Sequence, residues 1–218
     1  MRLFKNFLVG AAIAVLIRSA NADQSATCTG IWAANAKSPF VATNVPLQDI
    51  VAPDGKISIK TGDNGLSVIG QKSTTHLDDV IGNPPVTEIL WSPNSKSFVV
   101  NESDGGLIGT WTAYLYTLDL NDKPVPYHLE QLMHSAIVRI PKCDLKESTN
   151  LGAAAWLNDS KELLLVAEVP PHSSCKNMGS IVGFRISLQS RKIVEQLSES
   201  ALRKKWPGTL GCRFKRRQ

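Results

Sequence analysis

The chain lacks an apolar run long enough to span a bilayer. The longest, residues 7–17, falls well short of the roughly 20 residues that a transmembrane helix needs. The chain also lacks two motifs of familiar hydrolases. No G-x-S-x-G turn presents a serine nucleophile, and no H-E-x-x-H pair holds a catalytic zinc ion. We therefore expect no transmembrane segment in the mature chain, and no recognisable hydrolase site.

Histidine is scarce, with four in the whole chain. His76 precedes Asp78 and Asp79, a base followed by carboxylates that would orient it, although such residues often group by chance in loops. His128 and His134 fall six apart on a predicted helix and so do not share a metal-binding face. We identify no catalytic residue and no cofactor site from the sequence.

Cysteine is also sparse, and its four copies are Cys28, Cys143, Cys175 and Cys212. An even number in an exported chain favours disulfides, and four cysteines allow three pairings. We favour Cys28–Cys212, which would tie the two ends of the domain, and Cys143–Cys175. A metal site is the alternative, because His172 precedes Cys175 at a zinc-like spacing, but no second pair completes four ligands. We therefore predict no metal site.

The N-terminus has the three parts of a secretory signal peptide. Arg2 and Lys5 precede the apolar run, and Ala20-Asn21-Ala22 matches a small-residue cleavage site. The alternative, a buried N-terminal helix, lacks the amphipathic period of 3.6 residues. We predict cleavage after Ala22, export to the periplasm or the extracellular space, and a single domain over residues 23–218.

Charge is uneven along the chain. Of its 24 basic residues, Arg2, Lys5 and Arg18 lie in the signal peptide, which leaves 21 against 19 acidic ones and a net charge near +2. No acidic residue follows Glu199, and seven basic ones do: Arg203, Lys204, Lys205, Arg213, Lys215, Arg216 and Arg217. A basic end can bind a polyanion, but it is more often a solvated surface. For an exported protein we expect no nucleic-acid partner.

A repeated pattern dominates the rest of the chain. Residues 90–100 and 155–165 each read as a strand ending in tryptophan, a polar turn, a lysine and an apolar strand. A third unit shares the turn, so the turns lie at 53–56, 93–96 and 158–161. The strands predicted after them are 57–60, 66–70, 97–101, 110–120, 162–169, 181–188 and 193–197. Trp91 and Trp156 then occupy equivalent places, and we expect both to pack in the core. Trp32 and Trp111 are less constrained, and a sugar or peptide site is the alternative to packing, which we favour.

Two helices interrupt this β-rich pattern. Apolar residues recur with helical spacing at Leu129, Leu132, Met133, Ala136, Ile137 and Ile140. Pro126 is a candidate for the first helical position, and Pro141 would end the helix. A shorter helix is predicted over 199–206, with Ser198 as its N-cap and basic residues in its last turn.

Residues Trp91-Ser92-Pro93-Asn94-Ser95-Lys96 resemble the W-S-P-D-G-K blade signature of TolB-type and WD40-like β-propellers. Residues 156–165 match more loosely, residues 53–56 match only the turn, and the resemblance covers about residues 45–200. It implies a mainly β fold of three blade-like antiparallel units with two short helices. Three units are fewer than the four blades of the smallest closed propeller, so the resemblance implies a partial propeller with covered edges or one that closes by association. Residues 166–175, with the helix before Cys143, also resemble an uncharacterised group of exported bacterial proteins, a similarity that implies no known activity.

Two classes of function stay open. The first is an exported, disulfide-stabilised binding or scaffold module with a protein or glycan partner, in which self-association is possible. The second is an extracytoplasmic enzyme or carbohydrate-binding protein whose site is assembled from dispersed loops. The absence of recognisable motifs favours the first, and a carboxylate-lined pocket would favour the second.

Overall fold

A computed structural model describes residues 29–39, 49–62, 65–80, 86–105, 109–137 and 148–215. The predicted signal peptide, Cys28 and Cys143 lie outside these residues. Among the described residues, no helix is both long enough and apolar enough to cross a membrane.

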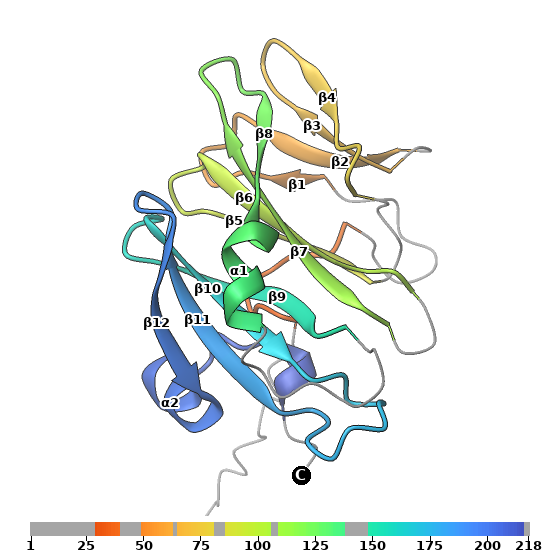
Figure 1. The fold of residues 1–218 in the computed structure, drawn as a ribbon. Coiled ribbons are helices and arrows are strands. Elements are labelled where there is room, and N and C mark those ends of the chain that lie inside the picture. The colour runs from red at the N-terminus through yellow and green to blue at the C-terminus, as the bar shows by residue number, and fades with distance from the viewer. Residues whose placement is uncertain are drawn as a thin grey trace, which may run out of the picture.

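Three four-stranded antiparallel sheets make up most of the described chain (Figure 1). The first sheet contains β1 (Ile50–Val51), β2 (Ser58–Gly62), β3 (Gly65–Ile69) and β4 (Thr74–His76). The second contains β5 (Thr87–Trp91), β6 (Ser97–Ser103), β7 (Trp111–Leu118) and β8 (Pro124–Tyr127). The third contains β9 (Asn150–Leu157), β10 (Glu162–Glu168), β11 (Ile181–Ser187) and β12 (Lys192–Ser198). Each sheet is a meander of consecutive strands, so the expectation of a mainly β fold with three antiparallel units is confirmed.

The turn that enters the second strand shares one backbone feature in all three sheets, although in the third sheet Asn158 and Asp159 are left-handed as well. Its third residue is left-handed each time, with φ of +75° at Gly55, +58° at Ser95 and +70° at Ser160. Serine adopts this conformation less readily than glycine, and here its hydroxyl makes a useful contact. The Ser95 Oγ accepts from the Asp54 N–H at 3.0 Å, and the Ser160 Oγ accepts from the Asn94 N–H at 3.2 Å. Each turn is thereby tied to the turn of the preceding sheet.

The repeated tryptophans make a second matched contact between sheets. Trp91 Nε1 donates to the Ile50 carbonyl at 3.1 Å, and Trp156 Nε1 donates to the Leu90 carbonyl at 3.1 Å. Ile50 and Leu90 occupy the same place in successive sheets, so the second sheet sits on the first as the third sits on the second. The predicted equivalence of the two tryptophans is confirmed, and both are partly buried with the indole N–H satisfied.

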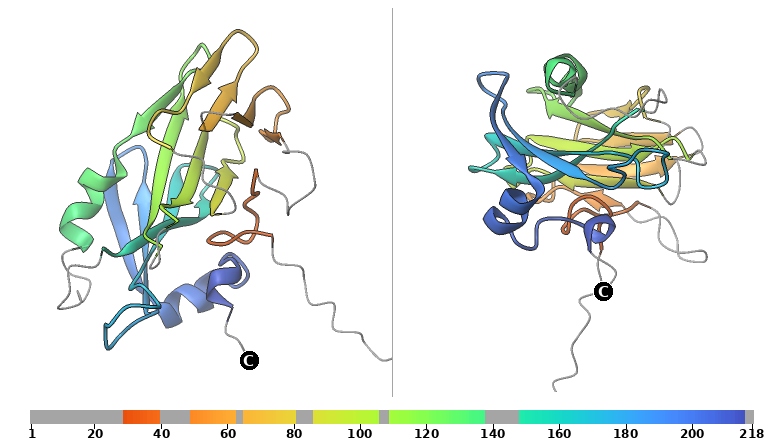
Figure 2. Two further views of the ribbon diagram at one scale, coloured as in Figure 1. Left: turned by 90° about the vertical axis from the view of Figure 1, so that its right-hand side faces the viewer. Right: turned by 60° about the horizontal axis from the view of Figure 1, so that its bottom comes forward.

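The sheets stack face to face, and their apolar residues alternate between two cores. Phe98 and Val100 of β6 pack against the first sheet, whereas Val99 packs against the third. Helix α1 (Leu129–Ile137) closes the core between the second and third sheets with Leu129 and Met133. Figure 2 shows α1 on one side of the molecule, and α2 (Glu199–Lys205) with both terminal segments on the opposite side.

The terminal segments pair with each other against the third sheet. We call residues 30–34 and 209–213 the terminal clasp. Gly211 N donates to the Trp32 carbonyl at 2.8 Å, Cys212 N to the Gly30 carbonyl at 2.8 Å, and Arg213 N to the Ile31 carbonyl at 3.1 Å. Residues of η1 (Cys212–Phe214) continue this segment, and Phe214 packs edge-on to the Trp32 ring at 5.2 Å. The clasp therefore joins the two ends of the described chain.

A buried carboxylate holds the clasp to the sheets. Glu88 accepts hydrogen bonds from the backbone N–H groups of residues 31, 32 and 33 and from Asn101 Nδ2. Asn101 also bonds both backbone groups of Ala153 in the third sheet. Because the Glu88 carboxylate and the Asn101 amide both have hydrogen-bond partners, the buried carboxyl group connects three parts of the chain and is not left isolated.

The helix predictions hold in one case and need correction in the other. Ser198 caps α2, and its Oγ accepts from the Ala201 N–H at 3.3 Å, as expected. Helix α1 begins at Leu129, so the prediction that Pro126 starts it was wrong, and His128 precedes the helix. Pro126 lies instead in β8, an edge strand, where a residue without an N–H is tolerated.

Candidate functional site

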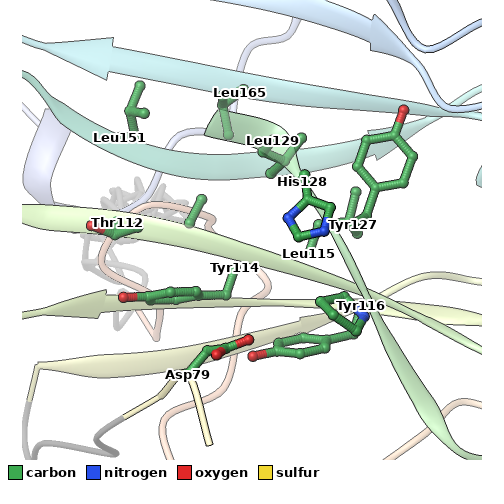
Figure 3. Close-up of a pocket in the computed structure, with 12 residues that line it drawn as sticks. Asp79, Thr112, Tyr114, Leu115, Tyr116, Tyr127, His128, Leu129, Leu151 and Leu165 are labelled. Carbon is green, nitrogen blue, oxygen red and sulfur yellow. The ribbon is translucent and has the colours of Figure 1, made fainter. Parts of the chain in front are cut away.

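A pocket of about 460 Å³ lies beside β7, between the loop after β4, the start of α1 and the third sheet (Figure 3). We call it the β7 pocket. Its polar lining comes from Asp79, Thr112, Tyr114, Tyr116, Tyr127 and His128, and its apolar lining from Ala113, Leu115, Pro126, Leu129, Leu151 and Leu165. The lining residues come from segments that are far apart in the sequence.

The pocket exists because β8 is short. Strand β8 pairs with β7 only from Leu115 to Leu118, and then the chain leaves to form α1. The first half of β7, residues 111–114, therefore has β6 on one side and no paired strand on the other, where the Asn150 side chain of β9 accepts from the Trp111 N–H at 3.0 Å. In the third sheet, β12 pairs with β11 from Val182 to Ser187 and leaves no comparable gap.

The ladder register fixes which backbone groups face this gap. The Leu118 N–H donates to the Lys96 carbonyl, and the Asp104 N–H donates to the Thr110 carbonyl. The N–H and C=O groups of the even-numbered residues of β7 therefore point toward β6. The odd-numbered residues point the other way, where Leu115 and Thr117 meet β8. Ala113 has no such partner, and its backbone groups face the side that β8 has left.

Two tyrosine hydroxyls at the pocket are buried without a hydrogen-bond partner among the described residues. Tyr116 is 3% exposed, and both its hydroxyl and that of Tyr127 lack a partner. Leaving a buried hydroxyl unsatisfied is costly, on the order of 1–3 kcal/mol, unless something else supplies the bond. Both hydroxyls therefore have unused hydrogen-bonding capacity, which a ligand reaches only when neighbouring side chains move, because neither oxygen is accessible in this conformation.

The phenols of the pocket stay protonated. Burial raises the pKa of Tyr116, and the negative charge of Asp79 raises it further. Burial is also the main cause of the raised pKa of Tyr114, with a contribution from Glu102. Burial raises the pKa of Tyr127, against an opposing effect of Arg191. These side chains can therefore donate and accept hydrogen bonds, but they are unsuited to act as bases.

Charge in the pocket is concentrated at one end. Among its described lining residues, Asp79 is the only side chain with a formal charge at neutral pH. Figure 3 shows its carboxylate beside the hydroxyl end of Tyr116 and below the Tyr114 side chain, with Leu151 and Leu165 on the other side of β7. The pocket thus has an acidic, hydroxyl-rich end and an apolar end.

A second pocket of about 320 Å³ adjoins the first and shares Pro126, Tyr127 and His128 with it. Arg191 lines this second pocket, and its guanidinium lies 5.5 Å from the centre of the Tyr127 ring. The basic side chain is therefore separated from Asp79 by the Tyr127–His128 wall.

The histidine candidates do not form a catalytic group. His76 Nε2 lies 4.0 Å from Asp78 Oδ1, and His76 Nδ1 lies 3.5 Å from Ser67 Oγ, on an exposed part of the first sheet. Asp79 lines the β7 pocket instead. No group of three histidine, cysteine or carboxylate side chains suited to a metal ion occurs within the described residues.

The described cysteines are compatible with the predicted disulfides but do not test the pairing. Neither Cys175 nor Cys212 is a free thiol. Their proposed partners, Cys143 and Cys28, lie outside the described residues. Cys175 is buried and His172 is exposed, so these two residues do not present a shared binding surface.

Sequence reasoning missed the β7 pocket. It gave no role to the three tyrosines, and it placed residues 126–128 in a helix. One signal was present, because Pro124 and Pro126 alternate with Val125 and Tyr127 as in an edge strand. Nothing local predicts that this strand stops after four residues. No protein-family model, no curated protein and no solved structure matches the chain.

Proposed function

We propose that this protein is an exported, disulfide-stabilised binding module, built as a partial propeller of three blades, which holds its ligand in the β7 pocket. The matched Trp91 and Trp156 contacts support the blade interpretation, because they repeat one geometry between successive sheets. The outer face of the third sheet is already covered, so no fourth blade is needed to bury it. This supports an open propeller of three blades.

The backbone of the terminal clasp supports the pairing Cys28–Cys212. Cys212 N donates to the carbonyl of Gly30, which lies two residues after Cys28 in the sequence. A disulfide there would reinforce the joined ends, and Cys143–Cys175 is then the remaining pair. Export, which disulfide formation requires, rests on the signal-peptide pattern of the first 22 residues.

The observation that carries the binding function is the pair of buried, unpartnered hydroxyls, Tyr116 and Tyr127, in one pocket. A pocket used for packing alone would favour phenylalanine at both places. Apolar walls with a few polar groups that converge are typical of ligand sites, and the volume lies in their usual range of about 300–1,000 Å³. Among the described lining residues no nucleophile is paired with a base, which favours binding over catalysis.

A fragment screen followed by two-dimensional NMR of the mature protein tests this function. We expect bound fragments to shift the amide signals of residues 113–116 and 127–129 together. In Thr112→Arg, a bulky charged side chain at an exposed lining position should abolish these shifts. Thr74→Arg, an exposed threonine on the first sheet, is the matched control and should leave them unchanged. Absence of binding, or binding that Thr112→Arg does not affect, would show the proposal to be wrong.

A further inference from the structure

We propose that the ligand of the β7 pocket is an extended peptide that adds to the open edge of β7 as a strand and places a basic side chain beside Asp79. This inference rests on the proposed binding function and names its ligand class. It uses three features of the pocket, namely an unpaired strand edge, walls of different character on the two faces of that edge, and a carboxylate next to a buried hydroxyl.

The strand edge supplies the main-chain contacts. Thr117 and Leu115 face β8, and the next residue in that series, Ala113, faces the vacated side with its N–H and C=O. Ala113 is buried, with 8% of its surface exposed, so a peptide must enter the pocket to reach its backbone groups. A peptide aligned where β8 would have continued can pair with both groups, as in other cases of strand addition to a sheet edge.

The alternation of side chains along β7 then sets a pattern for the peptide. Ala113 and Leu115 point toward the third sheet, where Leu129, Leu151 and Leu165 complete an apolar wall. Tyr114 and Tyr116 point toward the first sheet and Asp79. Side chains of an added strand alternate in the same way, so one would face the leucines and its neighbour would face the tyrosines and Asp79.

The negative charge of Asp79 favours a basic residue at the peptide position that faces the tyrosines. After burial, the negative charges of Asp79, Glu102 and Asp78 each raise the pKa of Tyr116, so the surroundings of this phenol are acidic. No lysine or arginine lies among the described residues that line the pocket, and Arg191 lies beyond Tyr127 in the adjoining pocket. A lysine or arginine from the peptide would pair with the Asp79 carboxylate.

The buried hydroxyl of Tyr116 offers the basic group a second hydrogen-bond partner. Tyr116 is the most buried of the three tyrosines, and its hydroxyl has no partner among the described residues. An ammonium or guanidinium group donates several hydrogen bonds and accepts none, so it can satisfy a phenol oxygen and a carboxylate together. The preferred ligand is therefore a segment in which apolar and basic residues alternate.

Peptide display on the mature protein tests the inference. A random twelve-residue library is selected on the wild-type protein, and the enriched peptides are synthesised for calorimetry. We expect lysine or arginine flanked at alternate positions by apolar residues. Asp79→Asn should weaken binding by roughly tenfold or more, because it removes a charge-assisted bond. Asp159→Asn, the same change in the distant turn between β9 and β10, should leave affinity unchanged.

A backbone change separates strand addition from simple side-chain binding. Methylation of one peptide nitrogen at a time should abolish binding at the position that donates to Ala113, and the adjacent position, whose N–H faces away, should tolerate it. Enriched peptides that are insensitive to both Asp79→Asn and methylation would overturn the inference.

Failure of the inference is distinguishable from failure of the proposed function. If fragments bind in the β7 pocket but no peptide is enriched, the ligand is a small molecule, the peptide inference is wrong and the binding function stands. If neither fragments nor peptides bind there, both are wrong.

Discussion

The outer face of the first sheet is mostly polar, with Val51 and Ile69 as its apolar members, whereas the outer face of the third sheet is apolar and covered. Ser58, Lys60, Thr74 and His76 stand on the first, and Lys60 pairs with Asp49 at 2.9 Å. On the third, Leu164, Val166 and Ile181 are buried under α2 and the terminal clasp. Between these ends, the two junctions of neighbouring sheets are alike. A stack of similar units can thus be ended either by polar residues or by added segments.

The difference matters because each sheet has two faces and an open stack leaves two of them without a neighbouring sheet. Burial of apolar surface is the main favourable contribution to folding, so an uncovered apolar face would be unstable or would associate. The first sheet avoids this by its sequence. The third avoids it through Trp32, Leu202 and Phe214, which come from outside the repeated units.

The largest expected effect lies at the covered end. Trp32 is fully buried, and its ring packs edge-on to Trp111 at 5.8 Å and to Phe214. Trp32→Ala should lower the free energy of unfolding by about 3–5 kcal/mol, measured by urea denaturation. Thr74→Ala at the polar end should change it by less than about 0.5 kcal/mol. Equal effects at both ends would contradict the comparison.

A second variant tests how closely the clasp fits the third sheet. A Cβ at Gly152 would lie 2.0 Å from the Trp32 ring, so Gly152→Ala should cost about 1–3 kcal/mol through overpacking. In the Trp32→Ala background the same change should cost much less, because the ring is gone. A double-mutant cycle measures this coupling, and additive effects would mean that Trp32 does not pack on Gly152.

The two junctions should respond alike to a smaller change. Trp91→Phe and Trp156→Phe each remove the indole N–H that reaches a carbonyl of the preceding sheet. We expect losses of about 0.5–1.5 kcal/mol, similar in the two variants. Denaturation curves that show a loss in one variant and none in the other would mean that the junctions are not equivalent.

The last prediction concerns the slope of stability with pH at the buried Glu88. Burial raises the pKa of Glu88 above its ordinary value of 4.5, although hydrogen bonds from Asn101 and the backbone N–H groups of residues 31–33 lower it again. A carboxyl group with a raised folded pKa stabilises most below its unfolded pKa, and this contribution declines as the pH rises through the folded value. Glu88→Gln should therefore flatten the fall in stability above about pH 4.5. An unchanged slope would show that another group titrates.

The repeated features were predictable because they are local. Turn residues flanked by apolar strands identified β2, β3, β6, β10 and β11, and the Ser198 cap identified α2. Strands β1 and β4 escaped prediction because they are two and three residues long. Strand β8 was mistaken for the start of a helix, since prolines occur both in the first turn of helices and on edge strands.

The candidate site was not predictable for a related reason. Its polar residues, Asp79, Tyr116 and His128, give no motif, and they meet only because three segments converge beside β7. His76 and Asp78 looked more suggestive in the sequence, yet they lie on the solvent-exposed edge of the first sheet. Spacing in the sequence carries no information about which loops meet in space.

The sequence by itself determined the class of fold, the number of repeated units, the equivalence of Trp91 and Trp156, and the second helix. All of these follow from turn chemistry, residue periodicity and capping, which act over a few neighbouring residues. Only the tertiary structure decided how the stack ends, because the clasp pairs residues 30–34 with 209–213 across nearly the whole chain. It also decided where a ligand can bind, because the open edge of β7 depends on where β8 stops and α1 turns away. Long-range pairing and burial select one arrangement among the many that the same local pattern permits.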